Sequence, residues 1–271
     1  MYPQFFGPPD QQLYGVLHLP EAGADRGLGA VLCQPILHEA ADCHRALRAL
    51  ADRLARAGVH VLRFDYGGTG DSAGDQESVD PARWRADIEA ARTELRESRG
   101  LDAVGLVGLR FGATLAAEAA AAADDVPFVV LWEPVTRGRP YVEGLRELQE
   151  AWLHHESAER PSARRHATPH EVFGHPFGPQ LSDGLEDTDL VQLASLPAPR
   201  VLLVDEGCGT GLDTLRTHLA GLDGGRLDHR RVDGGQIWQR AFDGEQARVP
   251  RALVDEIVGW IIETAAAEAT P

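Results

Sequence analysis

The sequence predicts an α/β domain in which helices cover both faces of a mostly parallel sheet. Short apolar stretches alternate with helical stretches along most of the chain, which is the order that parallel strands and their crossover helices produce. The strand stretches are apolar almost throughout, as expected when both faces of a sheet are covered. A length of 271 residues fits one such domain with an insertion better than two equal domains.

The individual elements follow from turn residues and periodicity. The segment from Phe5 to Pro20 is expected to form a hairpin, because Pro, Asp and Gln lie between two apolar stretches. Leu47, Leu50 and Leu54 recur at helical spacing in a helix that stops at Gly58. The strands expected after the hairpin cover residues 30–35, 59–65, 103–109, 128–134, 200–206 and 227–233. The expected helices cover residues 44–58, 81–98, 111–123, 213–222 and 251–269.

The stretch from residue 137 to residue 197 interrupts the alternation. It is far longer than the roughly two to six residues of an ordinary βα connection, so it is expected to form a mainly helical cap. Residues 1–136 and 198–271 would then form the core. One helical stripe in the cap is apolar and is expected to cover the sheet edge or a pocket. Its members are Val142, Leu145, Leu148 and Trp152.

The composition limits the classes of function. Lys and Arg number 26 and Asp and Glu 42, which gives a net charge of −16 and argues against binding to nucleic acid or to a membrane surface. The chain contains no lysine, which excludes Schiff-base chemistry on its own side chains. Three cysteines, no apolar leader and no apolar run of membrane-spanning length predict a soluble, cytoplasmic protein without a disulfide scaffold.

The sequence carries no motif that calls for a cofactor or a metal. The glycines of GGTGDS match neither a dinucleotide-binding nor a P-loop pattern, so no cofactor is expected. Five histidines fall in the cap, but no carboxylate or Cys spacing completes a ligand set, and Pro169 denies the pair in HATPH a common helix. These histidines are His154, His155, His166, His170 and His175.

Three segments carry a resemblance to a known family. They are LRFDYGGTGDSAG, VGLVGLRFGATLAAEAA and RRVDGGQIW, and they occur in the order and spacing of α/β-hydrolases. The chain resembles that superfamily over nearly its whole length. Within it, the chain is most similar to the bacterial branch of serine-aminopeptidase-like and exosortase-associated hydrolases. The resemblance implies an α/β-hydrolase fold, and it leaves function open because this fold hosts many chemistries.

The resemblance also implies a Ser-His-acid triad, and two of its positions are substituted. The family's G-x-S-x-G turn is here Gly108-Leu109-Arg110-Phe111-Gly112, and a guanidinium is neither a nucleophile nor a base at neutral pH. The family's histidine position falls on Gln236, which cannot shuttle a proton. The position of the acid stays open. Three nearby acids lie out of register with it, namely Asp205, Glu206 and Asp213.

Arg110 needs a partner of opposite charge, because it stands at a helix start whose dipole is positive. Two interpretations are open. Arg110 pairs with the carboxylate of Glu133, or it joins the backbone N–H of Phe111 in a clamp for a carboxylate or phosphate ligand. Glu133 itself is expected to pair with Arg110 or Arg137, although some relatives hold their catalytic acid after this strand.

His38 is the best remaining acid or base, with Glu39 as the group that would orient it. Both are expected in the loop after the strand at residues 30–35, where Glu39 would alternatively cap or pin the loop by pairing with an arginine of the following turn. Gln34 and Trp238 are further candidates for contact with a substrate, together with Arg110, Phe111 and Gln236. Cys208 is the likeliest reactive thiol.

Three functions therefore remain open. The first is a non-hydrolytic enzyme or a binding protein for a small molecule or peptide, with an anion as one expected ligand, in a bacterial biosynthetic pathway as the family's setting implies. The second is a hydrolase of an ester, thioester or amide rebuilt from His38, Glu39, Glu133 or Cys208. The third is a non-catalytic protein whose cap docks a partner protein. A homodimer or a complex with a pathway partner is compatible with each.

Overall fold

An eight-stranded sheet forms the centre of the protein, with the strand order β1-β2-β4-β3-β5-β6-β9-β10. The computed structural model describes residues 1–159, 170–207, 211–239 and 249–268. Strands β1 and β2 form an antiparallel hairpin, β2 pairs antiparallel with β4, and all other neighbours are parallel. The strands are β1 Tyr2–Phe6, β2 Leu13–His18, β3 Leu28–Cys33, β4 Val59–Phe64, β5 Ala103–Leu109, β6 Phe128–Trp132, β9 Arg200–Asp205 and β10 Arg226–Arg231.

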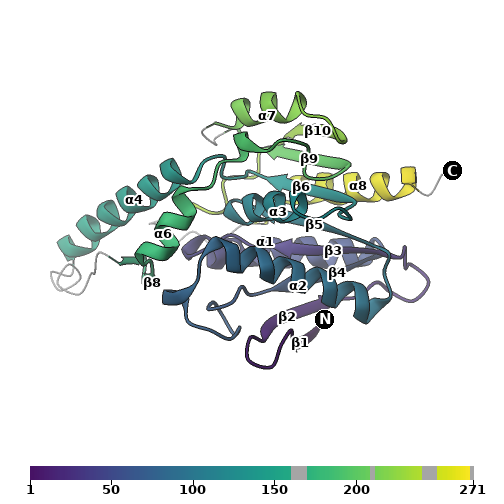
Figure 1. Cartoon of the computed structure of the whole chain (residues 1–271), viewed down its shortest axis with the longest axis horizontal. Coiled ribbons are helices and arrows are strands. Elements are labelled where there is room, and N and C mark those ends of the chain that lie inside the picture. Colours follow the sequence, from purple (N-terminus) through teal and green to yellow (C-terminus); the bar gives the residue numbers. More distant parts are fainter. Residues whose placement is uncertain (160–169, 208–210, 240–248, 269–271) are drawn as a thin grey trace.

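Helices cover both faces of this sheet (Figure 1). Helices α1 (His38–Arg56) and α8 (Arg251–Glu268) share one apolar cluster with one face, and α2 (Pro81–Arg99) and α3 (Phe111–Ala121) share the other cluster with the opposite face. Every residue of β3 and β6 is buried, which is why these strands are apolar without alternation. Helix α7 (Leu212–Ala220) connects β9 to β10. The α/β-hydrolase fold expected from the sequence is therefore correct.

The segment between β6 and β9 projects from the carboxyl end of the sheet (Figure 1). It contains α4 (Gly138–Glu159), a short hairpin of β7 (Glu171–Val172) and β8 (His175–Pro176), α6 (Pro179–Glu186) and the short helix η2 (Leu190–Gln192). The chain leaves and returns at one place, since Gly138 N donates to Thr188 O at 2.8 Å and Leu190 N donates to Thr136 O at 2.9 Å. The insertion is thus anchored at both of its ends.

Two details differ from the sequence-based expectation. Helix α1 begins at His38, whereas the apolar periodicity placed its start at residue 44, so His38 and Glu39 lie in the first helical turn and not in a loop. The polar residues of this first turn lack the apolar spacing by which a helix is recognised. The hairpin β7–β8 was not expected, and His166 lies outside the described residues. A helix long and apolar enough to cross a membrane is not found in the described ranges.

Candidate functional site

A sharp turn between β5 and α3 places Arg110 at the carboxyl edge of the sheet. Arg110 has φ 56° and ψ −128°, an unusual conformation for a residue with a side chain. Two glycines permit the turn. A Cβ on Gly112 would overlap the carbonyl oxygen of Gln34, and one on Gly108 would overlap the backbone of Ala113. The G-x-x-x-G spacing is therefore a packing requirement of this elbow.

A second turn of the same shape precedes α1. Leu37 has φ 55° and ψ −138°, close to the values of Arg110, and the helix begins at the next residue. Arg110 and two residues of the first turn of α1, His38 and Glu39, line a common pocket. Two helix starts, each with a positive dipole end, therefore converge on one place.

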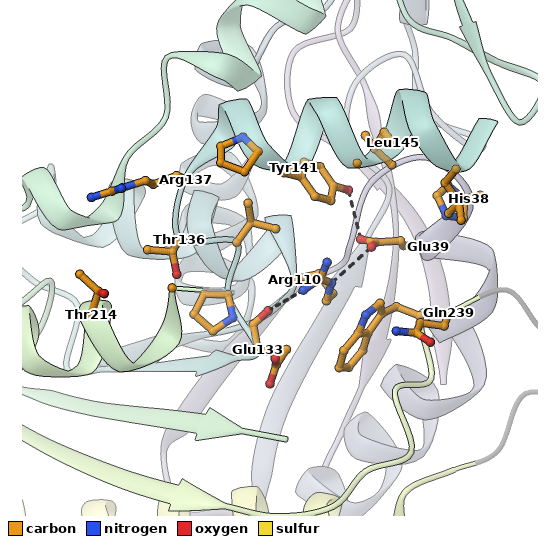
Figure 2. A pocket seen from close by; sticks show the side chains of 17 residues that line it. His38, Glu39, Arg110, Glu133, Thr136, Arg137, Tyr141, Leu145, Thr214 and Gln239 are labelled. Atoms are coloured by element: carbon orange, nitrogen blue, oxygen red, sulfur yellow. Dashed lines mark hydrogen bonds and ion pairs between the residues drawn. The ribbon is translucent and has the colours of Figure 1, made fainter. Parts of the chain in front are cut away.

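The guanidinium of Arg110 is ion-paired with the carboxylate of Glu39 (Figure 2). Arg110 Nε donates to Glu39 Oε1 at 3.2 Å, and Arg110 Nη1 donates to the backbone carbonyl oxygen of Glu133 at 3.4 Å. The prediction that Arg110 pairs with the carboxylate of Glu133 is thus wrong, because the partner is Glu39. Glu133 contacts Arg110 through its backbone carbonyl oxygen and not through its carboxylate. The backbone of Glu133 has a positive φ of 44° directly after β6.

Two aromatic residues, Trp238 and Tyr141, complete the surroundings of this ion pair. The guanidinium carbon of Arg110 lies 4.8 Å from the ring centroid of Trp238 and 5.9 Å from that of Tyr141, within cation–π range. Tyr141, in the first turn of α4, donates its hydroxyl to Glu39 Oε2 at 3.2 Å. Both carboxylate oxygens of Glu39 therefore accept a hydrogen bond. The sequence contained no signal for Tyr141, because its contact depends on how α4 folds over the sheet.

Burial dominates the electrostatics of the pair. Burial raises the pKa of the Glu39 carboxyl above its ordinary value, and Arg110 and then Tyr141 oppose that rise. Burial works against the charged form of Arg110 as well, but Glu39 and Tyr141 beside it keep the pKa of the guanidinium above its ordinary value. Arg110 is therefore a permanent cation with a built-in counter-ion.

The two acids next to this pair, Glu133 and Glu206, accept hydrogen bonds from backbone N–H groups. Glu133 is fully buried, and its Oε2 accepts the backbone N–H of Glu206 at 2.8 Å. The Glu206 carboxylate accepts from Trp132 Nε1 at 2.8 Å and from the backbone N–H groups of Gly234 and Gln236 at 3.1 and 3.0 Å. Glu206 thereby holds the loop after β10. Burial raises the pKa of Glu206, while Trp132 is the strongest influence in the opposite direction.

A pocket of about 860 Å³ opens above Arg110, between the sheet edge and α4. Thr136 at its wall is 4 % exposed, and its Oγ1 has no hydrogen-bond partner among the described residues. The apolar stripe of α4 turns toward this pocket, since Leu145 and Leu148 both line it. The lining residues are His38, Glu39, Arg110, Glu133, Pro134, Val135, Thr136, Arg137, Pro140, Tyr141, Gly144, Leu145, Leu148, Gly211, Thr214, Trp238 and Gln239.

The structure brings five of the eight candidate residues to this pocket. They are His38, Glu39, Arg110, Glu133 and Trp238. His38 is 6 % exposed and packs its ring against Phe173, with 4.5 Å between the ring centroids.

The other three lie outside the pocket lining. Gln34 donates its amide to Asp65 Oδ1 at 3.2 Å, Phe111 is fully buried in the core, and the side chain of Gln236 is hydrogen-bonded to Gln239. Cys208 lies outside the described residues. Within the described ranges, no group of three His, Cys, Asp or Glu side chains is arranged to hold a metal ion.

Comparisons with known proteins agree with this architecture. Residues 34–173 match the family described as serine aminopeptidase, S33. A proline iminopeptidase from Mycobacterium smegmatis has a similar structure, with 14 % identity and a TM-score of 0.64 over 98 % of this chain and 100 % of that chain. The ferulic acid complex of Est1E from Butyrivibrio proteoclasticus has 14 % identity and a TM-score of 0.66, over 97 % of this chain and 99 % of that one.

A further similar structure is an α/β serine hydrolase without a lid from Xanthomonas campestris. It has 18 % identity and a TM-score of 0.59, over 100 % of this chain and 96 % of that chain. No curated protein sequence matches this chain. Because the family match spans more than half of the sequence, the chain belongs to the serine aminopeptidase S33 family of α/β-hydrolases.

Proposed function

We propose that this chain is an α/β-hydrolase-fold protein without a working Ser-His-acid triad, and that it holds a small molecule in the pocket above Arg110 without hydrolysing it by serine chemistry. The observation that carries the proposal is the ion pair of Arg110 and Glu39. It occupies the elbow from which relatives with G-x-S-x-G present a nucleophile. A protonated guanidinium cannot form an acyl-enzyme.

The surroundings of Arg110 support binding over a rebuilt hydrolase. The carboxylate of Glu39 is ion-paired with Arg110 and accepts from Tyr141, and Glu133 Oε2 accepts from the main chain of Glu206. Such hydrogen bonds stabilise the charged carboxylate and make it a weaker general base. The pocket remains open, and its volume is within the range of small-molecule sites. A cap that served only to dock a partner protein would not require such a pocket.

The experiment is a screen of small neutral, anionic and cationic fragments by saturation-transfer NMR. Gly144→Leu locates the binding site, because a Cβ on this pocket-lining helical glycine meets no atom within 4 Å and a leucine there extends into the pocket. Gly259→Leu is the matched control, on an exposed position of α8 where a Cβ also meets nothing. Fragments that bind the wild type should bind Gly144→Leu more weakly and should bind Gly259→Leu as tightly as the wild type.

Two results would contradict the proposal. One is a screen without a binder, or with binders that ignore Gly144→Leu. The other is hydrolysis of short-chain p-nitrophenyl esters by the wild type at a rate that Gly144→Leu abolishes, which would identify the pocket as a hydrolytic site.

A further inference from the structure

The position of Arg110 would favour a negative charge if Glu39 were absent. The starts of α1 and α3 both lie there, and each contributes a positive dipole end beside the guanidinium. Glu39 belongs to the first turn of α1 and is 5 % exposed at its side chain, so it brings its carboxylate to Arg110 from within the protein. The anion that this place favours is therefore already present.

The charges around the pocket are balanced. Its lining contains two arginines, Arg110 and Arg137, and two glutamates, Glu39 and Glu133. Glu133 acts on Arg110 electrostatically in addition to Glu39. An anionic ligand at Arg110 would lie beside the carboxylate of Glu39, with a second carboxylate close by, and would also lose its hydration in a largely apolar pocket.

A neutral hydrogen-bond acceptor avoids both costs. Arg110 uses Nε for Glu39 and Nη1 for the carbonyl of Glu133, and no described residue accepts a hydrogen bond from Nη2. The side chain of Arg110 is 16 % exposed and lines the pocket. A carbonyl oxygen can accept from this nitrogen without displacing Glu39. The unpartnered hydroxyl of Thr136 is a second polar group at the same wall.

We propose that Glu39 is the protein's own occupant of the anion position at Arg110, and that it makes the pocket select uncharged ligands with a carbonyl-type acceptor and reject carboxylates. The inference rests on the proposed function, since it concerns a ligand of the same pocket. It replaces the anionic ligand that the sequence alone suggested. Glu39 is in this account a specificity-determining residue and not a base.

The first arm of the test compares three ligands with one aromatic body, namely naphthylacetamide, naphthylacetate and naphthylethylamine, by calorimetry at neutral pH. We expect the wild type to bind the uncharged amide about tenfold more tightly than the carboxylate, as like-charge juxtaposition at a contact requires. The amine should also bind less tightly than the amide. A carboxylate or amine that binds as tightly as the amide would overturn the inference while leaving the pocket a binding site.

The second arm changes the charge of Glu39 and little else. Glu39→Gln keeps the shape of the side chain and one acceptor oxygen for Arg110, and its amide N–H can donate to the hydroxyl of Tyr141. It should tighten naphthylacetate binding about tenfold while leaving the amide within about twofold. Glu118→Gln is the matched control, because Glu118 is also ion-paired, with Arg85 at 2.8 Å, but does not line this pocket. An unchanged preference in Glu39→Gln would overturn the inference.

A third arm does not depend on any pocket ligand. Glu39→Ala vacates the anion position, and formate should raise the melting temperature of this variant saturably and beyond chloride at the same ionic strength. The wild type and Glu118→Ala should show no such difference. If formate does no more than chloride, Glu39 is not occupying an anion site. If none of the three naphthyl ligands binds the wild type and the fragment screen also finds no binder, the proposed function fails, and this arm still decides the role of Glu39.

Discussion

The carboxylate of Glu39 and the guanidinium of Arg110 form a largely buried ion pair at 3.2 Å, although the two residues are 71 positions apart in the sequence. Arg110 comes from the elbow after β5, and Glu39 comes from the first turn of α1. Tyr141 adds a hydrogen bond from α4, so three separate segments of the chain meet at one carboxylate. The pair therefore connects the helical insertion to the sheet.

Removal of one partner of this pair should destabilise the protein. Arg110→Ala leaves the carboxylate of Glu39 buried without its counter-ion, and the free energy of unfolding should fall by about 3–5 kcal/mol. Urea denaturation of the double variant Arg110→Met with Glu39→Gln provides the control, because removing both charges should recover most of that loss. If the losses in Arg110→Met and Glu39→Gln, each measured singly, add up to the loss in the double variant, the two side chains do not interact.

The unpartnered hydroxyl of Thr136 should make the empty protein less stable than it could be. Thr136→Val replaces a buried hydroxyl that has no hydrogen-bond partner in the described part of the chain by a methyl group of the same size, and it should raise the free energy of unfolding by about 1 kcal/mol.

Thr114→Val is the opposite case. Thr114 is fully buried and donates its hydroxyl to Val135 O at 2.8 Å, so this variant should be less stable by about 1 kcal/mol. Equal losses of stability in both variants, measured by urea denaturation, would mean that the hydroxyl of Thr136 is satisfied in solution.

His18 should make stability depend on pH outside the pocket. Its Nε2 accepts from Arg63 Nε at 3.1 Å and its Nδ1 lies 2.9 Å from Asp52 Oδ1, which fixes the neutral ring. Burial, followed by Arg63, lowers its pKa from the ordinary value near 6.5. Because the folded-state pKa is depressed, the stabilisation is present above about pH 6.5 and is lost as the pH falls through the folded-state pKa.

The measurement is the free energy of unfolding between neutral and mildly acidic pH. The free energy of unfolding of the wild type should fall more steeply with decreasing pH than that of His18→Gln. The difference in slope should be at most about 1.4 kcal/mol per pH unit, which corresponds to the uptake of one proton. His170→Gln, at an exposed position, should follow the wild type. Parallel curves for the wild type and His18→Gln would refute the assignment.

The sequence predicted the parts of the fold that depend on local pattern. The apolar strands and the helix from Pro81 to about Ser98 could be recognised because burial imposes a period on neighbouring residues. The elbow was recognised through the resemblance to the family's G-x-S-x-G turn, and the structure explains Gly108 and Gly112 by close contacts of the backbone. The start of α1 could not, because its first turn carries no apolar period.

The candidate site was predicted only in part, for a related reason. Glu39 and Arg110 were both identified as candidate site residues, but their pairing depends on how β3 and β5 lie side by side and on the rotamers of both side chains. Glu133 was the wrong partner because its position after β6 does not reveal that its carboxylate turns to the backbone of Glu206. Sequence pattern constrains which face a residue occupies, not which of two nearby acids it reaches.

The central claim is that this protein has no serine nucleophile, because Arg110 occupies the elbow position where the family has its serine. Mass spectrometry of the intact protein after treatment with a fluorophosphonate tests it most directly. Ser72, the one serine in the motifs around the elbow, donates to Asp65 O at 2.5 Å and accepts from the backbone N–H of Tyr14 at 2.9 Å, as a structural turn residue does. We predict that the mass is unchanged under conditions that label an active serine hydrolase completely, whereas a stoichiometric adduct on any serine would contradict the account.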